Sequence, residues 1–230
     1  TFEGSPVSFP YELTEDTTFY AKWLEKCEIH YKTSYNIAPT VIGKGKKISS
    51  EYLPVLSNND DYFDGWYIED VRIEPEKYVV NGNITLVERW LEKCEISYKT
   101  EQGNAPASVT TGIGKTITFD QLPELTSDGY SFEGWYIGEK LIVANEYEVT
   151  SKEVTLTAKW VIIFDTENIK NSTDYVNGNL SLKSDYDKVI FKGDSSEVFS
   201  NLCIKVSNQN TKLIFDNFSF SSSKATPLIE

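Results

Sequence analysis

Apolar and polar residues alternate most regularly in two short segments, residues 27–32 and 94–99. A period of two is typical of a β-strand that has one face in a hydrophobic core and the other in water. The positions expected to face the core are Cys27, Ile29 and Tyr31 in the first segment and Cys94, Ile96 and Tyr98 in the second. The polar positions between them, including His30, are expected to face water.

Three further segments end on a tryptophan, and each predicts a closing strand. The apolar positions that alternate are Phe19, Ala21 and Trp23 in one segment and Leu156, Ala158 and Trp160 in another. The middle segment ends at Trp90, but Glu88 occupies the position that is alanine in the other two. We therefore expect this middle strand to pack less regularly.

These segments belong to an internal repeat. Residues 24–29 recur at 91–96, an offset of 67, and the Gly-Trp-Tyr at 65–67 recurs at 134–136. Repeats at a fixed period indicate stacked or serial copies of one structural unit. The predicted parts are the second half of a module in residues 1–23, full modules in 24–90 and 91–160, and a different segment in 161–230.

The junctions between these modules are short. Three residues separate Trp90 from Cys94, and no glycine- or serine-rich linker is present. The last strand of one module should therefore run into the first strand of the next. This predicts an elongated, stiff array.

Other elements follow from shorter patterns. Leucines three apart in residues 48–56 and 117–125 predict one or two helical turns, with Pro54 and Pro123 in a first turn. Residues 63–67 and 132–136 are predicted strands. The fold class is therefore mainly β with small α content.

Two motifs resemble a known family. Residues 132–136 read Phe-Glu-Gly-Trp-Tyr, and residues 155–160 read Thr-Leu-Thr-Ala-Lys-Trp, with support from 63–67 and 18–23. This pattern resembles the Listeria–Bacteroides repeat, also called the internalin B-repeat, over about residues 1–160. Residues 87–90 depart from it in the middle copy.

The resemblance implies a β-grasp-like module, with a four-stranded sheet packed on a short helix. It also implies tandem arrays on secreted or wall-attached bacterial proteins, where they act as spacers, stalks or adhesion modules. It supplies no catalytic residues.

The composition after Trp160 shifts toward serine, asparagine and aspartate, broken by short apolar runs. At an offset of 24, residues 189–191 align with 213–215 and Ile204 aligns with Leu228. A period of this size resembles the start of a right-handed β-helix. A β-sandwich explains the same strands nearly as well.

Charge and rare residues exclude several functions. The 22 Lys+Arg and 35 Asp+Glu residues give a net charge of −13, which disfavours nucleic acid and anionic lipid as partners. No apolar run approaches a membrane span. The single histidine, His30, excludes a multi-histidine metal site. The three cysteines match no zinc or redox spacing. The chain begins at Thr1 and contains no methionine, so we expect an interior piece of a longer polypeptide.

Two motifs for ligands fail on inspection. Residues 112–116 resemble the end of a phosphate-binding loop, but Val109 occupies the position of the required glycine, which favours a simple turn. Residues 58–61, which read Asn-Asn-Asp-Asp, suggest a calcium loop together with Asp64, but Tyr62 occupies a ligand position, which favours a solvated turn. We expect no cofactor and no metal.

Aromatic residues make up 13% of the chain. Trp66 and Trp135 alternate away from the neighbouring aromatic residues, so they are the candidates for glycan contact at the surface. The residues expected in the cores are Cys27, Ile29, Tyr31, Trp90, Cys94, Ile96, Tyr98 and Trp160.

Together these features predict a non-catalytic spacer or adhesion segment of an extracellular bacterial surface protein. Its partners would be a host or cell-surface protein, a glycan, or further domains of the same polypeptide. The alternatives are ancillary modules of a carbohydrate-active β-helix enzyme and the subunit of a self-assembling surface fibre.

Overall fold

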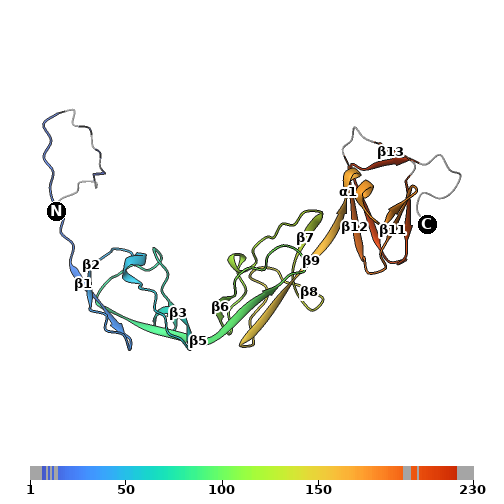
Figure 1. Ribbon diagram of the computed structural model, residues 1–230. Coiled ribbons are helices and arrows are strands. Elements are labelled where there is room, and N and C mark those ends of the chain that lie inside the picture. The colour runs from blue at the N-terminus through green and yellow to red at the C-terminus, as the bar shows by residue number, and fades with distance from the viewer. Residues whose placement is uncertain are drawn as a thin grey trace. The chain divides into compact units, whose positions relative to one another are not determined.

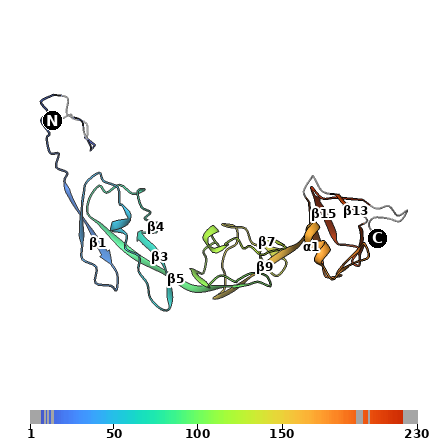
Figure 2. The ribbon, with the colours of Figure 1, turned by 45° about the horizontal axis from the view of Figure 1, so that its top comes forward.

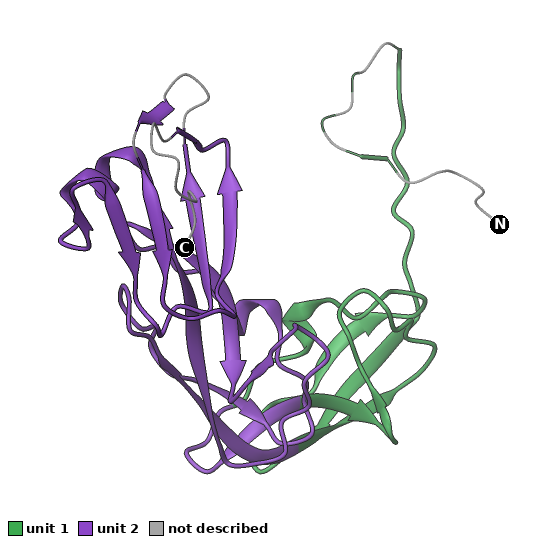
Figure 3. Cartoon of the chain, turned by 90° about the vertical axis from the view of Figure 1, so that its right-hand side faces the viewer, with its two compact units in different colours: residues 1–56, 65–89 green, residues 57–64, 90–230 purple. Residues whose placement is uncertain are grey.

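The computed structural model describes residues 15–193, 198–200 and 202–221, together with residues 7, 8, 10 and 12. Contacts divide the chain into two compact units (Figure 3). Unit 1 comprises residues 1–56 and 65–89, and unit 2 comprises residues 57–64 and 90–230.

Unit 1 is built around one mixed sheet. Its elements are β1 (Lys26–Lys32), β2 (Thr40–Gly43), the 3-10 turn η1 (Ser50–Tyr52), β3 (Asp61–Ile68), β4 (Val71–Arg72) and the first part of β5 (Ile84–Lys99). Strand β1 pairs antiparallel with β2 and parallel with β5, while β3 pairs with β4 and β5. The first and last strands of the repeat are therefore neighbours that run in the same direction.

The second full repeat lies in unit 2 and has the same topology. Its elements are the second part of β5, β6 (Val109–Gly112), the 3-10 turn η2 (Phe119–Gln121), β7 (Tyr130–Ile137), β8 (Lys140–Leu141) and β9 (Glu153–Phe164). The sheet order is β6-β5-β9-β7-β8, with β5 parallel to β9 and the other pairs antiparallel. Figure 2 shows β7 beside β9. The module is mainly β, as the sequence predicts. Where the resemblance implies a four-stranded sheet packed on a short helix, the sheet has five strands and the helical element between β6 and β7 is a single 3-10 turn.

The predicted inward faces are largely correct. Cys27, Ile29, Cys94, Ile96 and Tyr98 are buried. Three more predicted core residues, Tyr31, Trp90 and Trp160, are half-buried. Trp160 packs against the cluster formed by the second repeat.

The expected helical turns exist, but their position differs from the prediction. Each is a single 3-10 turn that ends before its proline, Pro54 or Pro123. The two prolines therefore do not occupy a first helical turn. The carbonyl group of each accepts a hydrogen bond from a tryptophan indole instead.

Strand β5 confirms that one repeat runs into the next without a linker. It is a single 16-residue strand whose first part pairs with β1 and whose second part pairs with β6 and β9 (Figure 1). It continues through Glu88 without interruption. The Glu88 carboxylate accepts hydrogen bonds from the Thr33 hydroxyl and from Ser34 N at 3.1 Å. A polar partner therefore replaces the apolar contact that alanine would make.

The inward set predicted for residues 18–23 is wrong. Residues 15–25 contain no helix or strand, and Phe19 and Trp23 are 49% and 90% exposed. In the second full repeat the closing strand packs between the first strand and the Phe-x-Gly-Trp-Tyr strand. Residues 18–23 form no strand, so their alternation alone does not bury them.

The segment after Trp160 forms a stack of strands with its own core within unit 2, and this stack continues the sheet of the second repeat through β9. Its elements are the end of β9, α1 (Thr166–Asn171), β10 (Tyr175–Val176), β11 (Asn179–Leu182), β12 (Lys188–Lys192), β13 (Val198–Ser200), β14 (Cys203–Val206), β15 (Lys212–Asp216) and β16 (Ser219–Ser221). Parallel pairs join β9 with β12, β12 with β15, β11 with β14, and β13 with β16. Only β10 and β11 pair antiparallel in the part of the stack that the structure describes.

The predicted offset of 24 appears directly in this pairing. Val189 is the partner of Leu213, and Phe191 is the partner of Phe215. Strands β11 and β14 show the same offset. Phe164, Phe191 and Phe215 stack one above another, with ring centroids 5.7 and 5.1 Å apart. The expected pair of Ile204 with Leu228 lies outside the described residues.

Candidate functional site

Trp66 and Trp135, the candidates for glycan contact, lie in the cores of the repeats. Each is 2% exposed, and each donates an indole hydrogen bond of 2.8 Å, to the carbonyl of Pro54 or Pro123. Neither ring presents a face to the surface, so the glycan interpretation of these two residues is wrong.

A β-bulge explains the burial of Trp135. The register between β7 and β9 shifts between Phe132 and Gly134, so Glu133 is an extra residue in its strand. Gly134 has a φ of +134°, which side-chain-bearing residues rarely adopt. The extra residue reverses the alternation, and Phe132 and Trp135 therefore both reach the core.

Asp64, which the sequence interpretation assigned to a solvated turn, is instead a buried acid in β3. Its side chain is 7% exposed and forms an ion pair with the Lys115 ammonium, which is 32% exposed. Both residues belong to unit 2. Asp64 stands at the position of Glu133 in the other repeat, and Glu133 pairs with Lys188. An acid directly before the bulge glycine in both copies was the available sequence signal.

Lys115 also decides the interpretation of residues 112–116. The segment follows β6 as a turn, with Gly114 at a φ of +89°. The lysine that a phosphate-binding loop would direct at its ligand here binds the Asp64 carboxylate.

Residues 58–61 form an exposed turn, which the Asn58 side chain closes by hydrogen bonding. Asn58 Oδ1 accepts hydrogen bonds from the backbone N–H groups of Asp60, at 2.9 Å, and Asp61, at 2.6 Å. Among the described residues, no three His, Cys, Asp or Glu side chains are placed to hold a metal ion.

The thiols of Cys27 and Cys94 are free and buried at equivalent positions of the two repeats. Burial, followed by the charges of Glu153 and Glu95, raises the pKa of the Cys94 thiol above its ordinary value. A thiol of this kind is a poor nucleophile at neutral pH.

His30 is half-buried, and its Nε2 lies 3.2 Å from the Glu28 carboxylate. This pair lies on the outer face of β1, as the alternation predicts.

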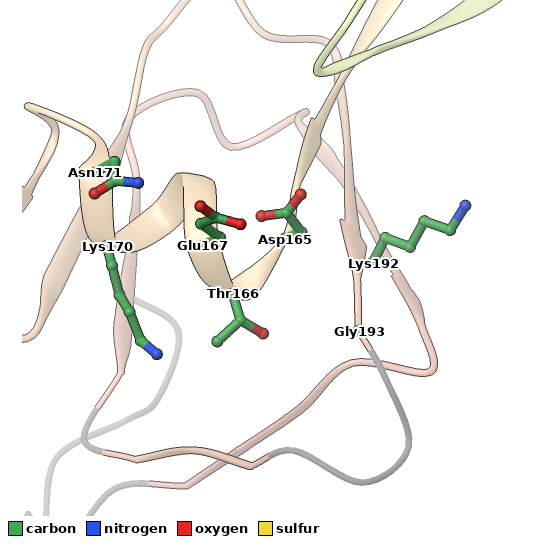
Figure 4. A pocket seen from close by; sticks show the side chains of 7 residues that line it. All are labelled: Asp165, Thr166, Glu167, Lys170, Asn171, Lys192 and Gly193. Atoms are coloured by element: carbon green, nitrogen blue, oxygen red, sulfur yellow. The ribbon is translucent and has the colours of Figure 1, made fainter.

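The surface hollows of unit 2 are polar and open. One surrounds the start of α1 and is lined by Asp165, Thr166, Glu167, Lys170, Asn171, Lys192 and Gly193 (Figure 4). In Figure 4 the side chains of Lys170 and Lys192 point in different directions, so they do not converge on one ligand position. Another hollow lies beside Trp160 and Tyr186, and the ion-paired side chains of Lys188 and Glu133 form part of its lining.

In the described part of the chain, no helix is long and apolar enough to span a membrane.

Comparison with known proteins identifies the second repeat. Residues 95–159 match the family model described as the Listeria-Bacteroides repeat domain. Two provisionally named proteins of Evansella cellulosilytica are similar to the chain. A Gly-rich membrane protein is 29% identical over 162 residues, and a membrane protein is 29% identical over 163 residues. Each alignment covers 65% of this chain but only 18% or 23% of the relative.

No solved structure matches the chain significantly. The family model confirms the resemblance to the Listeria-Bacteroides repeat domain for residues 95–159.

Proposed function

We propose that this chain is a non-catalytic spacer and adhesion segment of a bacterial surface protein. The observation that carries the proposal is the way the two full repeats agree. They share a core, a topology and the indole bond to a proline carbonyl, with 2.8 Å in both copies. Outside the core they differ, since His30 corresponds to Ser97 and the acidic turn at 58–61 has no counterpart.

This distribution favours a structural role. A catalytic or ligand-binding repeat needs polar groups in a fixed arrangement, whereas a spacer needs only a stable core and a firm connection to its neighbours. Strand β5 belongs to both repeats and joins them without a linker. The match of residues 95–159 to a repeat family and the membrane-protein names of two relatives support a place at the cell surface.

Protease shaving of intact cells that produce the full-length polypeptide tests this location. Peptides from residues 15–193 should be released from intact cells, with a cytoplasmic protein as the control that stays inside. Recovery of these peptides only after cell lysis would contradict the proposal.

We further propose that the segment from Val161 onward begins a parallel β-helix. Its support is the parallel pairing at an offset of 24 and the stacked phenylalanines, because a β-sandwich is built from antiparallel neighbours. Ser181 and Lys205 are exposed register partners on β11 and β14.

A disulfide between cysteines placed at these two positions tests the register. Bridged residues must have Cα atoms about 4.4–6.8 Å apart, which in-register neighbours satisfy. In a chain with Cys203→Ser, the Ser181→Cys/Lys205→Cys pair should oxidise readily, while Ser181→Cys/Asp216→Cys should not. The reverse result would exclude the parallel arrangement.

A further inference from the structure

The first and last strands of each full repeat form a parallel pair. In unit 1, β1 and β5 pair from Ile29–Ile84 to Lys32–Val87. In unit 2, β5 and β9 pair from Glu95–Glu153 to Lys99–Thr157. All other strand pairs within the two repeats whose register is described are antiparallel.

This arrangement determines how tension along the chain acts on a repeat. Tension enters at the start of the first strand and leaves at the end of the last strand. Because the two strands are parallel neighbours, the tension pulls them past each other along their own axes. The bonds of a parallel ladder are evenly spaced, so they all bear the load together instead of opening one at a time.

Further hydrogen bonds reinforce both ends of the parallel pair in the first repeat. At one end, Glu28 N donates to Asn83 Oδ1 at 2.9 Å. At the other end, the Glu88 carboxylate accepts from the Thr33 hydroxyl and from Ser34 N. Each of these bonds joins the first strand, or the turn after it, to β5 or the residue before β5.

The second repeat places equivalent bonds between different groups. Glu95 N donates to Lys152 O at 2.8 Å, and the Ser97 and Thr155 hydroxyls lie 3.0 Å apart. At the far end, Trp160 Nε1 donates to Thr100 Oγ1 at 2.9 Å. Thr100 corresponds to Thr33, so the same threonine position is bonded to the closing strand in both repeats.

We propose that the parallel pair of first and last strands is a mechanical clamp by which each repeat resists tension along the chain. Strand β5 belongs to both clamps, so it passes tension from one repeat to the next through a continuous backbone. Glu88 closes the end of the first clamp. Its departure from the alanine of the other copies is therefore functional and not a packing fault. This role rests on the proposed surface location, because only a segment between an anchor and a bound partner carries tension.

Single-molecule stretching of the full chain tests the clamp. With handles at the two termini, each full repeat should unfold in one step that lengthens the chain by about 230 Å, at 3.3–3.6 Å for each of about 67 residues, less the end-to-end distance of the folded repeat. With handles at Lys26 and Lys44, the force acts at the open end of the β1–β2 hairpin and separates antiparallel pairs one at a time. The hairpin should open at a several-fold lower force than the terminal pull requires.

Substitution of Glu88 tests whether its carboxylate closes the end of the first clamp. Under constant force from the termini, Glu88→Ala should shorten the lifetime of one repeat about tenfold, because bonds to a charged group are lost and forced unfolding follows the unfolding rate. Glu88→Gln keeps an acceptor and should retain most of the lifetime. The matched control is Glu28→Ala, which removes a carboxylate from the same strand pair without removing the Glu28 N–H.

Two results would overturn the inference. One is an equal rupture force in the two pulling geometries, and the other is an unchanged lifetime after Glu88→Ala. Both results are independent of the cell-shaving experiment. The two kinds of experiment can therefore give different answers. The repeats can prove mechanically weak although the segment lies at the cell surface, or mechanically strong although the segment lies inside the cell.

Discussion

Replacement of Trp135 by phenylalanine isolates the polar bond that holds the second repeat together. Trp135 is 2% exposed and packs against the rings of Tyr98, at 5.0 Å, and Phe132, at 5.6 Å. Its indole N–H donates to the carbonyl of Pro123 at 2.8 Å. Phenylalanine keeps an aromatic ring in the core but removes this donor and part of the ring volume.

The expected loss of stability has two parts. A buried carbonyl that loses its donor costs about 1–3 kcal/mol. A residual cavity of about 40 Å³ adds on the order of 1 kcal/mol, at ~24 cal/mol per Å³. The free energy of unfolding of the second repeat should therefore fall by about 2–4 kcal/mol.

Urea unfolding, followed by far-ultraviolet circular dichroism, measures this loss. Trp66→Phe is the matched variant in unit 1, because Trp66 is equally buried and makes the same 2.8 Å bond to Pro54. The two variants should lose similar amounts. A loss within about 0.5 kcal/mol, typical of a surface substitution, would refute the role given to the indole bond.

Four further results are expected. Cys27 and Cys94 should react with a thiol reagent only after denaturation, and fast labelling of the native chain would contradict their burial. Because burial chiefly raises the pKa of Cys94 above 9.0, the unfolded chain ionises first, and stability should decline as the pH rises past that value. Lys115→Ala should destabilise unit 2 by about 1–3 kcal/mol, since it leaves the Asp64 carboxylate buried without its cation. An unchanged urea midpoint would mean that water replaces the lysine. Trp160→Ala should cost about 3–5 kcal/mol, and a loss no larger than that of an exposed alanine variant would show that this half-buried ring contributes little.

The sequence was sufficient for features that depend on local periodicity. The strands at 27–32 and 94–99 have their cysteine and isoleucine inside because a pleated strand points successive side chains to opposite faces. The three-residue junction after Trp90 was too short for a linker, and it lies inside strand β5. The offset of 24 in the last segment appears as parallel register because the residues that it relates are partners in the pairs β12–β15 and β11–β14.

Tertiary structure decided the features that break periodicity or need a distant partner. Trp135 is buried because a bulge inserts one residue before the glycine, and strict alternation of side chains does not allow for an inserted residue. The glycine within each strand was the signal that could have indicated it.

Partners distant in the sequence decided the rest. Phe19 and Trp23 are exposed because residues 15–25 form no strand despite their alternation, whereas Glu88 is accommodated because Thr33 and Ser34 lie beside it. Local pattern therefore determined which face of a strand is apolar. Whether that face is covered, and by which groups, depends on residues about 55 positions away, which only the folded chain brings into contact.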